Sequence, residues 1–277
     1  MTWGQWGKAL DTRGMIDLIE ASMLLKINTF DHADIYGGYT TEREFGTAFS
    51  DSGIDRETVV FISKCGIQMP CVERELPVKH YSYSKKHIEM SVENSLRNLK
   101  TDYLDVLLLH RPSPLMEAET IAETAYALKK SGKIKSLGVS NFTPSQMDLI
   151  QQEIPLEWNQ IECSLTHYDP LLDGTLDQIQ KNKIGTMAWS PLGSYYKTEN
   201  DQKNRIQKQI HTLCDKYNCT EQQLLLAWLL RHPAKIYPVV GTTNPERLAL
   251  SVAAEKIKLE LTDWFILMEA SMGKPLP

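Results

Sequence analysis

Side chains that can move protons follow several strand-like segments of the 277-residue chain. Asp31 and Tyr36 lie in the segment FDHADIYGG, Lys64 follows the run VVFIS, and His110 follows the run LDVLLL. A tyrosine has an ordinary pKa of about 10 and is a poor proton donor at neutral pH unless it is tuned. We expect Lys64 to stabilise the phenolate and lower the pKa of Tyr36, while Asp31 keeps Lys64 charged. With His110 orienting a carbonyl oxygen, this set could protonate that oxygen while another group delivers hydride.

Each of these residues also has an ordinary structural interpretation. Asp31 could be a loop carboxylate, Tyr36 a packing aromatic, and His110 a buried histidine whose hydrogen bonds are made. Lys64 could form a simple salt bridge, since a lysine buried without a partner at the end of an apolar strand is costly. It is their joint placement at the ends of successive strands that favours a catalytic site.

The elements that must position these residues alternate between strands and helices. Apolar runs predict strands at 29–30, 59–63, 104–109, 134–139, 157–161, 185–189 and 236–240. Periodicity and start signals predict helices around 15–23, from 41, from 84, over 117–131, from 144, from 171, over 205–217 and 221–231, from 245 and over 262–272. Capping-box patterns begin the helices at Thr41, Thr143 and Thr220. A long loop over 65–84 and a polar insertion over 193–204 complete the pattern.

Two α/β folds fit this alternation, a doubly wound sheet and a barrel. No GxGxxG follows a predicted strand and no GxxxxGK[ST] occurs, so the usual phosphate-binding loops of doubly wound folds are missing. Polar residues at the ends of many successive strands favour the barrel, in which all these ends share one mouth. We therefore expect a (β/α)8 TIM barrel that forms one domain over residues 1–277.

Composition narrows the class of protein further. A net charge of −5 and a pI of about 5.8 do not suggest binding to nucleic acid or to an acidic membrane. The apolar run at 224–230 is far shorter than the roughly 18 residues that indicate a membrane span. The N-terminus lacks a signal peptide's apolar stretch, and the five cysteines form no CxxC pair. We expect reduced thiols, a cytoplasmic location, a monomer or weak oligomer, and no metal site.

Seven segments together resemble the aldo-keto reductase superfamily, in the right order from about Thr29 to Arg247. These are FDHADIYGG, ISKCG, YLDVLLLHRP, KIKSLGVSNF, EWNQIE, MAWSPLG and VVGTTNPERL. The resemblance implies that Asp31, Tyr36, Lys64 and His110 are the catalytic tetrad. It also implies a barrel that uses NADP(H) without a Rossmann fold to reduce a small-molecule carbonyl substrate.

The same resemblance implies a set of cofactor-binding residues. Ser140, Asn141 and Gln160 would hydrogen-bond the nicotinamide carboxamide, and Trp189 would stack on the ring. Ser190, Leu192 and Gly193 would line the pyrophosphate. Gly241, Thr242 and Asn244 would wrap the adenosine phosphate at a helix N-terminus, where backbone N–H groups bind anions. Arg247 would face the 2′-phosphate.

Three departures from the family pattern qualify these expectations. Gly241-Thr242 replaces the usual Lys-Ser pair and removes one charge from the 2′-phosphate pocket, so NAD(H) is a possible alternative to NADP(H). The chain is expected to lack the N-terminal hairpin and most of the first barrel strand, with residues 1–4 as the end of that strand. The short C-terminal tail predicts an open substrate pocket. Candidate walls for that pocket are Trp3, Trp6, Tyr81 and Tyr83, which could equally be packing residues.

Two other functions stay open at this point. The chain could be a catalytically weak accessory or redox-sensor subunit that binds the nucleotide without turnover. It could also be a Schiff-base aldolase with Lys64 as nucleophile. The aldolase hypothesis leaves Asn141, Gln160 and Trp189 without a role.

Overall fold

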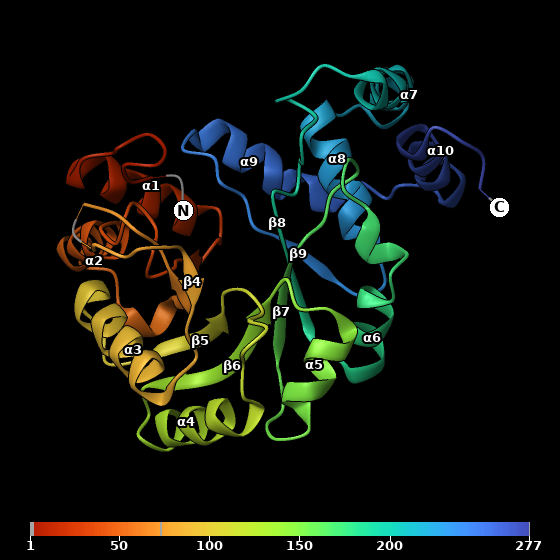
Figure 1. Ribbon diagram of the computed structural model, residues 1–277. Helices are drawn as coiled ribbons and strands as arrows, with labels where there is room; N and C mark the ends of the chain where they lie inside the picture. Colours follow the sequence, from red (N-terminus) through yellow and green to blue (C-terminus); the bar gives the residue numbers. More distant parts are fainter. Residues whose placement is uncertain (1–2, 73, 277) are drawn as a thin grey trace. The chain divides into compact units, whose positions relative to one another are not determined.

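The computed structural model describes residues 3–72 and 74–276 (Figure 1). Contacts between Cα atoms divide the chain into two compact units. Unit 1 contains residues 1–159 and 243–245, and unit 2 contains residues 160–242 and 246–277. The expectation of a single domain stays a prediction.

Unit 1 is built from βα repeats. Its helices are α1 (Thr12–Leu24), α2 (Thr41–Ser52), α3 (Lys85–Leu99), α4 (Ala118–Lys130) and α5 (Pro144–Gln151). Its strands are β1 (Thr29–Asp31), β2 (Val60–Cys65), β3 (Ile67–Gln68), β4 (His80–Tyr81), β5 (Leu104–Leu109) and β6 (Ile134–Ser140), and a short 3₁₀ turn lies at Arg56–Thr58. Strands β1, β2, β5 and β6 pair in parallel in that order, and consecutive helices pack beside one another on the outside of these strands (Figure 1).

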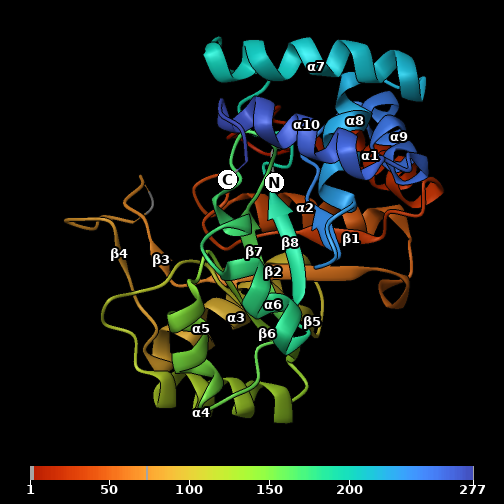
Figure 2. The ribbon, with the colours of Figure 1, turned by 90° about the vertical axis from the view of Figure 1, so that its right-hand side faces the viewer.

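Strand β7 (Trp158–Glu162) runs from unit 1 into unit 2. Unit 2 continues with α6 (Thr175–Asn182), β8 (Gly185–Trp189), α7 (Asp201–Tyr217), α8 (Glu221–Leu230), β9 (Ile236–Pro238), α9 (Pro245–Ala253) and α10 (Leu261–Met272). Short 3₁₀ turns lie at Asp169–Leu171 and Ala254–Lys256. Strands β8 and β9 pair in parallel, and α7 packs on both α8 and α10 (Figure 2).

An aromatic cluster forms much of the core behind the first strands of unit 1. Phe30, Phe45 and Phe61 are buried, and the Phe30 and Phe45 ring centroids lie 5.2 Å apart. Close packing of α2 on α3 depends on Gly46, because a Cβ there would collide with the backbone of Asn98 and Leu99. The sequence pattern therefore brings the C-terminal ends of β1 and β2 together over a rigid core.

Several sequence-based expectations are corrected by the structure. The capping box at Thr41 is wrong: Thr40 is the N-cap of α2, and no side chain caps this helix. The helix expected from 171 begins at Thr175, because Asp169–Leu171 forms a 3₁₀ turn instead. The loop over 65–84 contains the antiparallel strands β3 and β4, which project away from β2 and β5 in Figure 2.

The expected first-strand remnant falls partly outside the described residues. Residues 1–2 are not described, and Trp3 and Gly4 do not lie in a strand. Trp3 is instead buried against Phe30 and Phe45, so it belongs to the core and not to the wall of a pocket.

Candidate active site

The Lys64 ammonium group is the centre of the candidate active site in unit 1. Lys64 lies near the C-terminal end of β2, and its side chain is 0% exposed. Its Nζ atom lies 2.7 and 2.8 Å from the two carboxylate oxygens of Asp31, which ends β1. The same atom donates to the backbone oxygen of His32 at 2.8 Å and lies 3.2 Å from the Tyr36 hydroxyl. The structure therefore brings Asp31, Tyr36 and Lys64 into direct contact.

The chain returns sharply after Tyr36. The Tyr36 N–H donates to the Ala33 carbonyl at 3.1 Å, and Gly37 and Gly38 follow with φ of 63° and 67°. Positive φ favours glycine, and a Cβ at Gly37 would also collide with Thr40 and Thr41. The two glycines thus allow α2 to begin soon after the loop. This tight connection fixes the position of Tyr36.

Electrostatics keep Lys64 charged. Burial alone would lower the pKa of Lys64, but the Asp31 carboxylate and the Tyr36 hydroxyl overcome this effect and raise it. A buried ammonium is stable only with such partners. Lys64 is thus a fixed positive charge beside the phenol.

Tyr36 departs from one expectation. Burial raises the pKa of Tyr36, the Lys64 ammonium lowers it, and Asp31 raises it again, so that the net pKa lies above its usual value. The effect of Lys64 has the expected sign, but the prediction of a lowered net pKa is wrong because desolvation is larger. Tyr36 therefore holds its proton at neutral pH, as a proton donor must.

His110 lies directly after β5 and faces Tyr36. The two ring centroids are 5.8 Å apart in an edge-to-face arrangement. Burial lowers the pKa of His110 well below its usual value, and the Lys64 and Arg111 charges lower it further. The imidazole is therefore neutral and can donate one N–H bond to a substrate oxygen.

The aromatic side chains proposed as walls of the substrate pocket differ in their position relative to this site. Trp6 is 53% exposed, and its ring centroid lies 6.4 Å from that of Tyr36, as a wall of the substrate pocket would. Tyr83 is buried and donates to the Arg111 carbonyl at 2.5 Å. Tyr81 packs against the small cluster of Ala33, Ile35 and Ile67. Only Trp6 of the four aromatic candidates keeps the position expected for substrate contact.

The polar residues expected to bind the carboxamide lie within or directly after β6 and β7. Ser140 ends β6 and accepts a hydrogen bond of 2.8 Å from the Asn141 amide, and Asn141 has a φ of 61°. Asn244, expected at the adenosine phosphate and not at the carboxamide, belongs to unit 1 by its contacts and precedes α9. Gln160 is buried in β7, with its amide nitrogen 3.8 Å from the sulfur of Met187. Such amides are suited to a carboxamide, which needs both a donor and an acceptor.

In unit 2, Trp189 ends β8 and is partly exposed. Ser190 and Gly193 have positive φ, and the Gly193 N–H donates to the Ser190 carbonyl at 2.7 Å. A Cβ at Gly193 would collide with the hydroxyls of Ser164 and Thr166, so the tight turn here requires glycine. Leu192, within the turn, is partly exposed.

Gly241 and Thr242 lie in the loop between β9 and α9, and Arg247 lies in the first turn of α9 with an exposed side chain. Unit 1 offers the partly exposed amide of Asn141, and unit 2 offers the buried amide of Gln160, the partly exposed indole of Trp189 and an arginine in the first turn of a helix. Each of these groups is of a type that a dinucleotide can use. No helix in the described part of the chain is long and apolar enough to cross a membrane.

Comparison with known proteins agrees with this geometry. The model of the aldo/keto reductase family matches residues 1–271. The chain belongs to the aldo/keto reductase family of oxidoreductases.

Individual relatives cover nearly the whole chain. It is 42% identical over 269 residues to uncharacterized oxidoreductase YcsN of Bacillus subtilis, covering 95% of this chain and 90% of that one. It is 39% identical to 6-dehydroglucose reductase of Agrobacterium fabrum, covering 92% of this chain and 87% of the relative. The crystal structure of the thermostable aldo-keto reductase Tm1743 with the inhibitor epalrestat matches with a TM-score of 0.83 at 25% identity, covering 97% of this chain and 93% of that one. The family match and this likeness confirm the expected (β/α)8 barrel.

Two polar residues of the same loop were given no role from the sequence. His32 and Asp34 lie between Asp31 and Tyr36 in the sequence, and both are buried. The only signal for them in the sequence is the density of ionisable residues in DHAD, which does not say which side chains point inward.

Proposed function

We propose that the protein reduces aldehydes or ketones to alcohols with NADP(H), with Tyr36 as the proton donor. The observation that carries this proposal is the 3.2 Å contact between the Lys64 ammonium and the Tyr36 hydroxyl. A carbonyl oxygen that gains negative charge during reduction needs a proton and a nearby positive charge, and this pair offers both. The bound nicotinamide would supply the hydride.

In this proposal the tetrad divides the work. His110, as a neutral imidazole, orients the carbonyl oxygen through an N–H bond. Tyr36 transfers its proton to that oxygen as the alcohol forms. Lys64 then stabilises the phenolate left on Tyr36, which offsets part of the cost that the raised pKa of the buried phenol adds to proton transfer. Asp31 holds Lys64 in place through its two short contacts.

Cofactor binding is assigned to the residues named from the family resemblance. Ser140, Asn141 and Gln160 would hold the carboxamide, and Trp189 would cover one face of the ring. Ser190, Leu192 and Gly193 would line the pyrophosphate, and Gly241, Thr242 and Asn244 the adenosine phosphate. Arg247 would bind the 2′-phosphate and favour NADP(H) over NAD(H).

The Schiff-base alternative is disfavoured by the charge on Lys64. A nucleophilic lysine must be neutral to attack a carbonyl carbon. Here the pKa of Lys64 is raised, despite burial, by Asp31 and Tyr36, which keeps the amine protonated. If borohydride trapped a carbonyl substrate on Lys64, this reasoning would be overturned.

The decisive experiment replaces Tyr36 with phenylalanine. Tyr36→Phe should reduce kcat about 100–10,000-fold, because general acid catalysis is worth roughly 10²–10⁴ and no other described acid contacts Lys64 besides Asp31. The dissociation constant for NADPH, measured by fluorescence titration, should change less than about threefold. Turnover is followed by NADPH absorbance over a panel of aldehydes, ketones and oxidised sugars. The sugars are included because one relative is named a 6-dehydroglucose reductase.

Tyr126→Phe is the matched control, because Tyr126 is exposed and its hydroxyl donates to the Glu153 carbonyl. Unchanged turnover in Tyr36→Phe would refute the assignment. Tight NADPH binding by the wild type with no turnover across the panel would instead favour the sensor or accessory subunit.

A further inference from the structure

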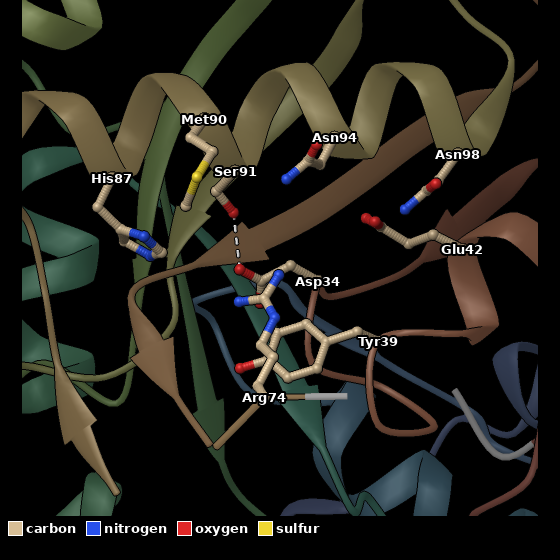
Figure 3. A pocket seen from close by; sticks show the side chains of 9 residues that line it. All are labelled: Asp34, Tyr39, Glu42, Arg74, His87, Met90, Ser91, Asn94 and Asn98. Carbon is tan, nitrogen blue, oxygen red and sulfur yellow. Dashed lines mark hydrogen bonds between the residues drawn. The ribbon is translucent and has the colours of Figure 1, made fainter. Parts of the chain in front are cut away.

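A small polar cavity lies in unit 1 behind the loop that carries Tyr36 (Figure 3). Its volume is about 160 Å³, and its walls come from that loop, from α2 and α3, and from the segment between β3 and β4. At roughly 30 Å³ per water molecule, the cavity could hold about five waters or one small organic molecule.

Asp34 is the unsatisfied group of this cavity. Its side chain is only 8% exposed, and one carboxyl oxygen, Oδ2, accepts a hydrogen bond of 2.6 Å from the Ser91 hydroxyl. The other oxygen, Oδ1, is buried and meets no donor at hydrogen-bond geometry among the described residues, although the nearby Ile35 backbone N–H and the Arg74 charge lower the pKa of the carboxyl group. Figure 3 shows this carboxyl group pointing into the cavity. A buried acceptor without a donor destabilises the fold, and a suitable ligand would recover that loss.

A second buried carboxyl group lines the cavity, and burial raises its pKa too. Glu42 is 2% exposed and accepts a 2.6 Å bond from Ser63, and it is also bonded by Ser95 and Asn98. Its oxygens are therefore already engaged, and it contributes charge more than a vacant acceptor. Against these two acids stands Arg74, whose guanidinium lies 3.6 Å from the centroid of the Tyr39 ring. Once ionised, the two carboxyl groups outnumber the one guanidinium, so the cavity does not suit an anion.

A metal ion is also a poor match. No group of three or more His, Cys, Asp or Glu side chains that could hold a metal occurs in the described part of the chain. The amide oxygen of Asn94 accepts a bond from Arg97 at 3.0 Å, and Asn98 is bonded to Glu42. Too few oxygen ligands are left for Ca²⁺ or Mg²⁺, which require six or more. A cation that brings its own N–H donors fits better.

We propose that this cavity binds a small primary ammonium ion, whose N–H groups donate to Asp34 Oδ1 and whose short carbon chain lies against Tyr39 and Met90. Tyr39 and Met90 supply the aromatic and thioether surface that lines the cavity beside the acids. The volume limits the chain to about three or four carbons. This site is separate from the tetrad and does not depend on the proposed carbonyl reduction.

The position of Asp34 connects this site to the catalytic loop. The Asp34 N–H donates to the Lys64 carbonyl at 3.1 Å, and Asp34 lies in the turn that ends at Tyr36. A ligand on Asp34 therefore contacts the same short segment that positions the phenol.

The test measures binding of n-propylammonium chloride to the full chain by calorimetry or ligand-detected NMR. Tetramethylammonium chloride at equal ionic strength is the comparison ligand, because it carries the same charge without N–H donors. The wild type should bind n-propylammonium saturably with a Kd below about 50 mM and should bind tetramethylammonium at least about tenfold more weakly. Equal affinity for both cations, or no saturable binding, would overturn the proposal.

Asp34→Asn should weaken n-propylammonium binding at least about tenfold, because it removes the charge but keeps an acceptor for Ser91. Asp51→Asn, an exposed carboxylate in α2, is the matched control and should bind as the wild type does. If Asp34→Asn bound the ligand as tightly as the wild type, the assignment to Asp34 would be wrong.

A pH series on the wild type tests the same assignment without a variant. Burial raises the pKa of Asp34 to about 7, the Ser91 bond lowers it, and Glu42 raises it. The other ionisable groups facing Asp34 are Tyr39, Cys65, Arg74, Tyr83 and His87. An alkylammonium stays protonated to about pH 10, so its affinity should rise severalfold from about pH 6 to pH 8 as Asp34 ionises. A flat profile would contradict the proposal.

Discussion

Neighbouring ionisable side chains in the loop after β1 meet very different surroundings. Asp31 contacts the Lys64 ammonium through both oxygens, His32 is buried with neither ring nitrogen bonded to a described residue, and Asp34 is bonded through one oxygen. Only the pairing of Asp31 with Lys64 compensates fully for the removal of the side chain from water. The loop thus combines a well-paired carboxylate with two groups that lower stability, as functional segments often do.

Asp34→Asn should change how stability depends on pH. In the folded protein burial raises the pKa of Asp34 to about 7, whereas the unfolded value is about 3.9. Between these values the folded state binds more protons than the unfolded state, so stability falls as pH rises from about 4 to 7. Asp34→Asn removes this loss in the free energy of unfolding, which is at most about 4 kcal/mol. Urea denaturation at several pH values measures it, and an unchanged slope would contradict the burial of a titrating carboxyl group.

His32→Leu should stabilise the protein. His32 is fully buried, its ring centroid lies 4.4 Å from that of Phe45, and its two nitrogens have no described partner. Leucine fills a similar volume without a buried polar atom, so the free energy of unfolding should rise by about 1–3 kcal/mol at neutral pH. The bond from Lys64 to the His32 backbone oxygen would be kept.

The same substitution has a pH signature. Burial lowers the pKa of His32 well below its usual value, with Lys64 adding to the effect. The unfolded state therefore takes up the proton first, and the wild type loses stability as pH falls below about 6.5. His32→Leu should show a smaller loss in acid. Destabilisation by His32→Leu at neutral pH would mean that the ring makes a contact that this structure lacks.

At the scale of elements, Asp105 joins three neighbouring strand regions of unit 1. Its Oδ2 atom accepts 2.8 Å bonds from Arg56 and from the Phe61 backbone N–H, and its Oδ1 atom lies 2.9 Å from Lys135. The guanidinium of Arg56 also lies 4.0 Å from the centroid of the Tyr103 ring. These contacts link the start of β2 to β5 and β6 at the end remote from the tetrad.

Asp105→Ala should lower the free energy of unfolding by about 2–4 kcal/mol, because it leaves Arg56 and a backbone N–H without their acceptor. The Asp105 side chain is only 14% exposed, so water replaces the carboxylate poorly. Asp102→Ala, at an exposed position before β5, is the control and should change stability by less than about 0.5 kcal/mol. Equal unfolding midpoints for the two variants would show that the Asp105 contacts contribute nothing.

The start of a helix could be predicted from the sequence where the side chain of the N-cap residue bonds a backbone N–H of the first turn. Thr143 and Thr220 form the expected capping boxes with Gln146 and Gln223. The pattern at Thr41 failed because the helix begins at that residue, and its hydroxyl is buried without a described partner. Strands β3 and β4 are two residues each, too short to show any periodicity.

At the scale of the whole molecule, the order of polar strand ends predicted the barrel, which the family match confirms, whereas the catalytic tetrad stays a prediction. The degree to which each side chain is shielded from water could not be predicted in the same way. The pKa of Tyr36 depends on how much water the surrounding loops exclude, and no local pattern of residues reports this. The unsatisfied oxygen of Asp34 likewise depends on the placement of α3, about 50 residues later in the chain.

The choice of cofactor can be tested through the stability of the whole molecule. A ligand that binds only the folded state adds about 2.7 kcal/mol at a concentration 100 times its Kd. If Arg247 binds the 2′-phosphate as we propose, Arg247→Gln should weaken NADPH about 10–100-fold and remove about 1.3–2.3 kcal/mol of this stabilisation at the same concentration. The effect of NADH on the thermal midpoint should not change, because NADH lacks that phosphate. Arg231→Gln, at an exposed position after α8, is the control for loss of positive charge. Equal losses with NADPH and NADH would mean that Arg247 acts on the fold and not on the phosphate.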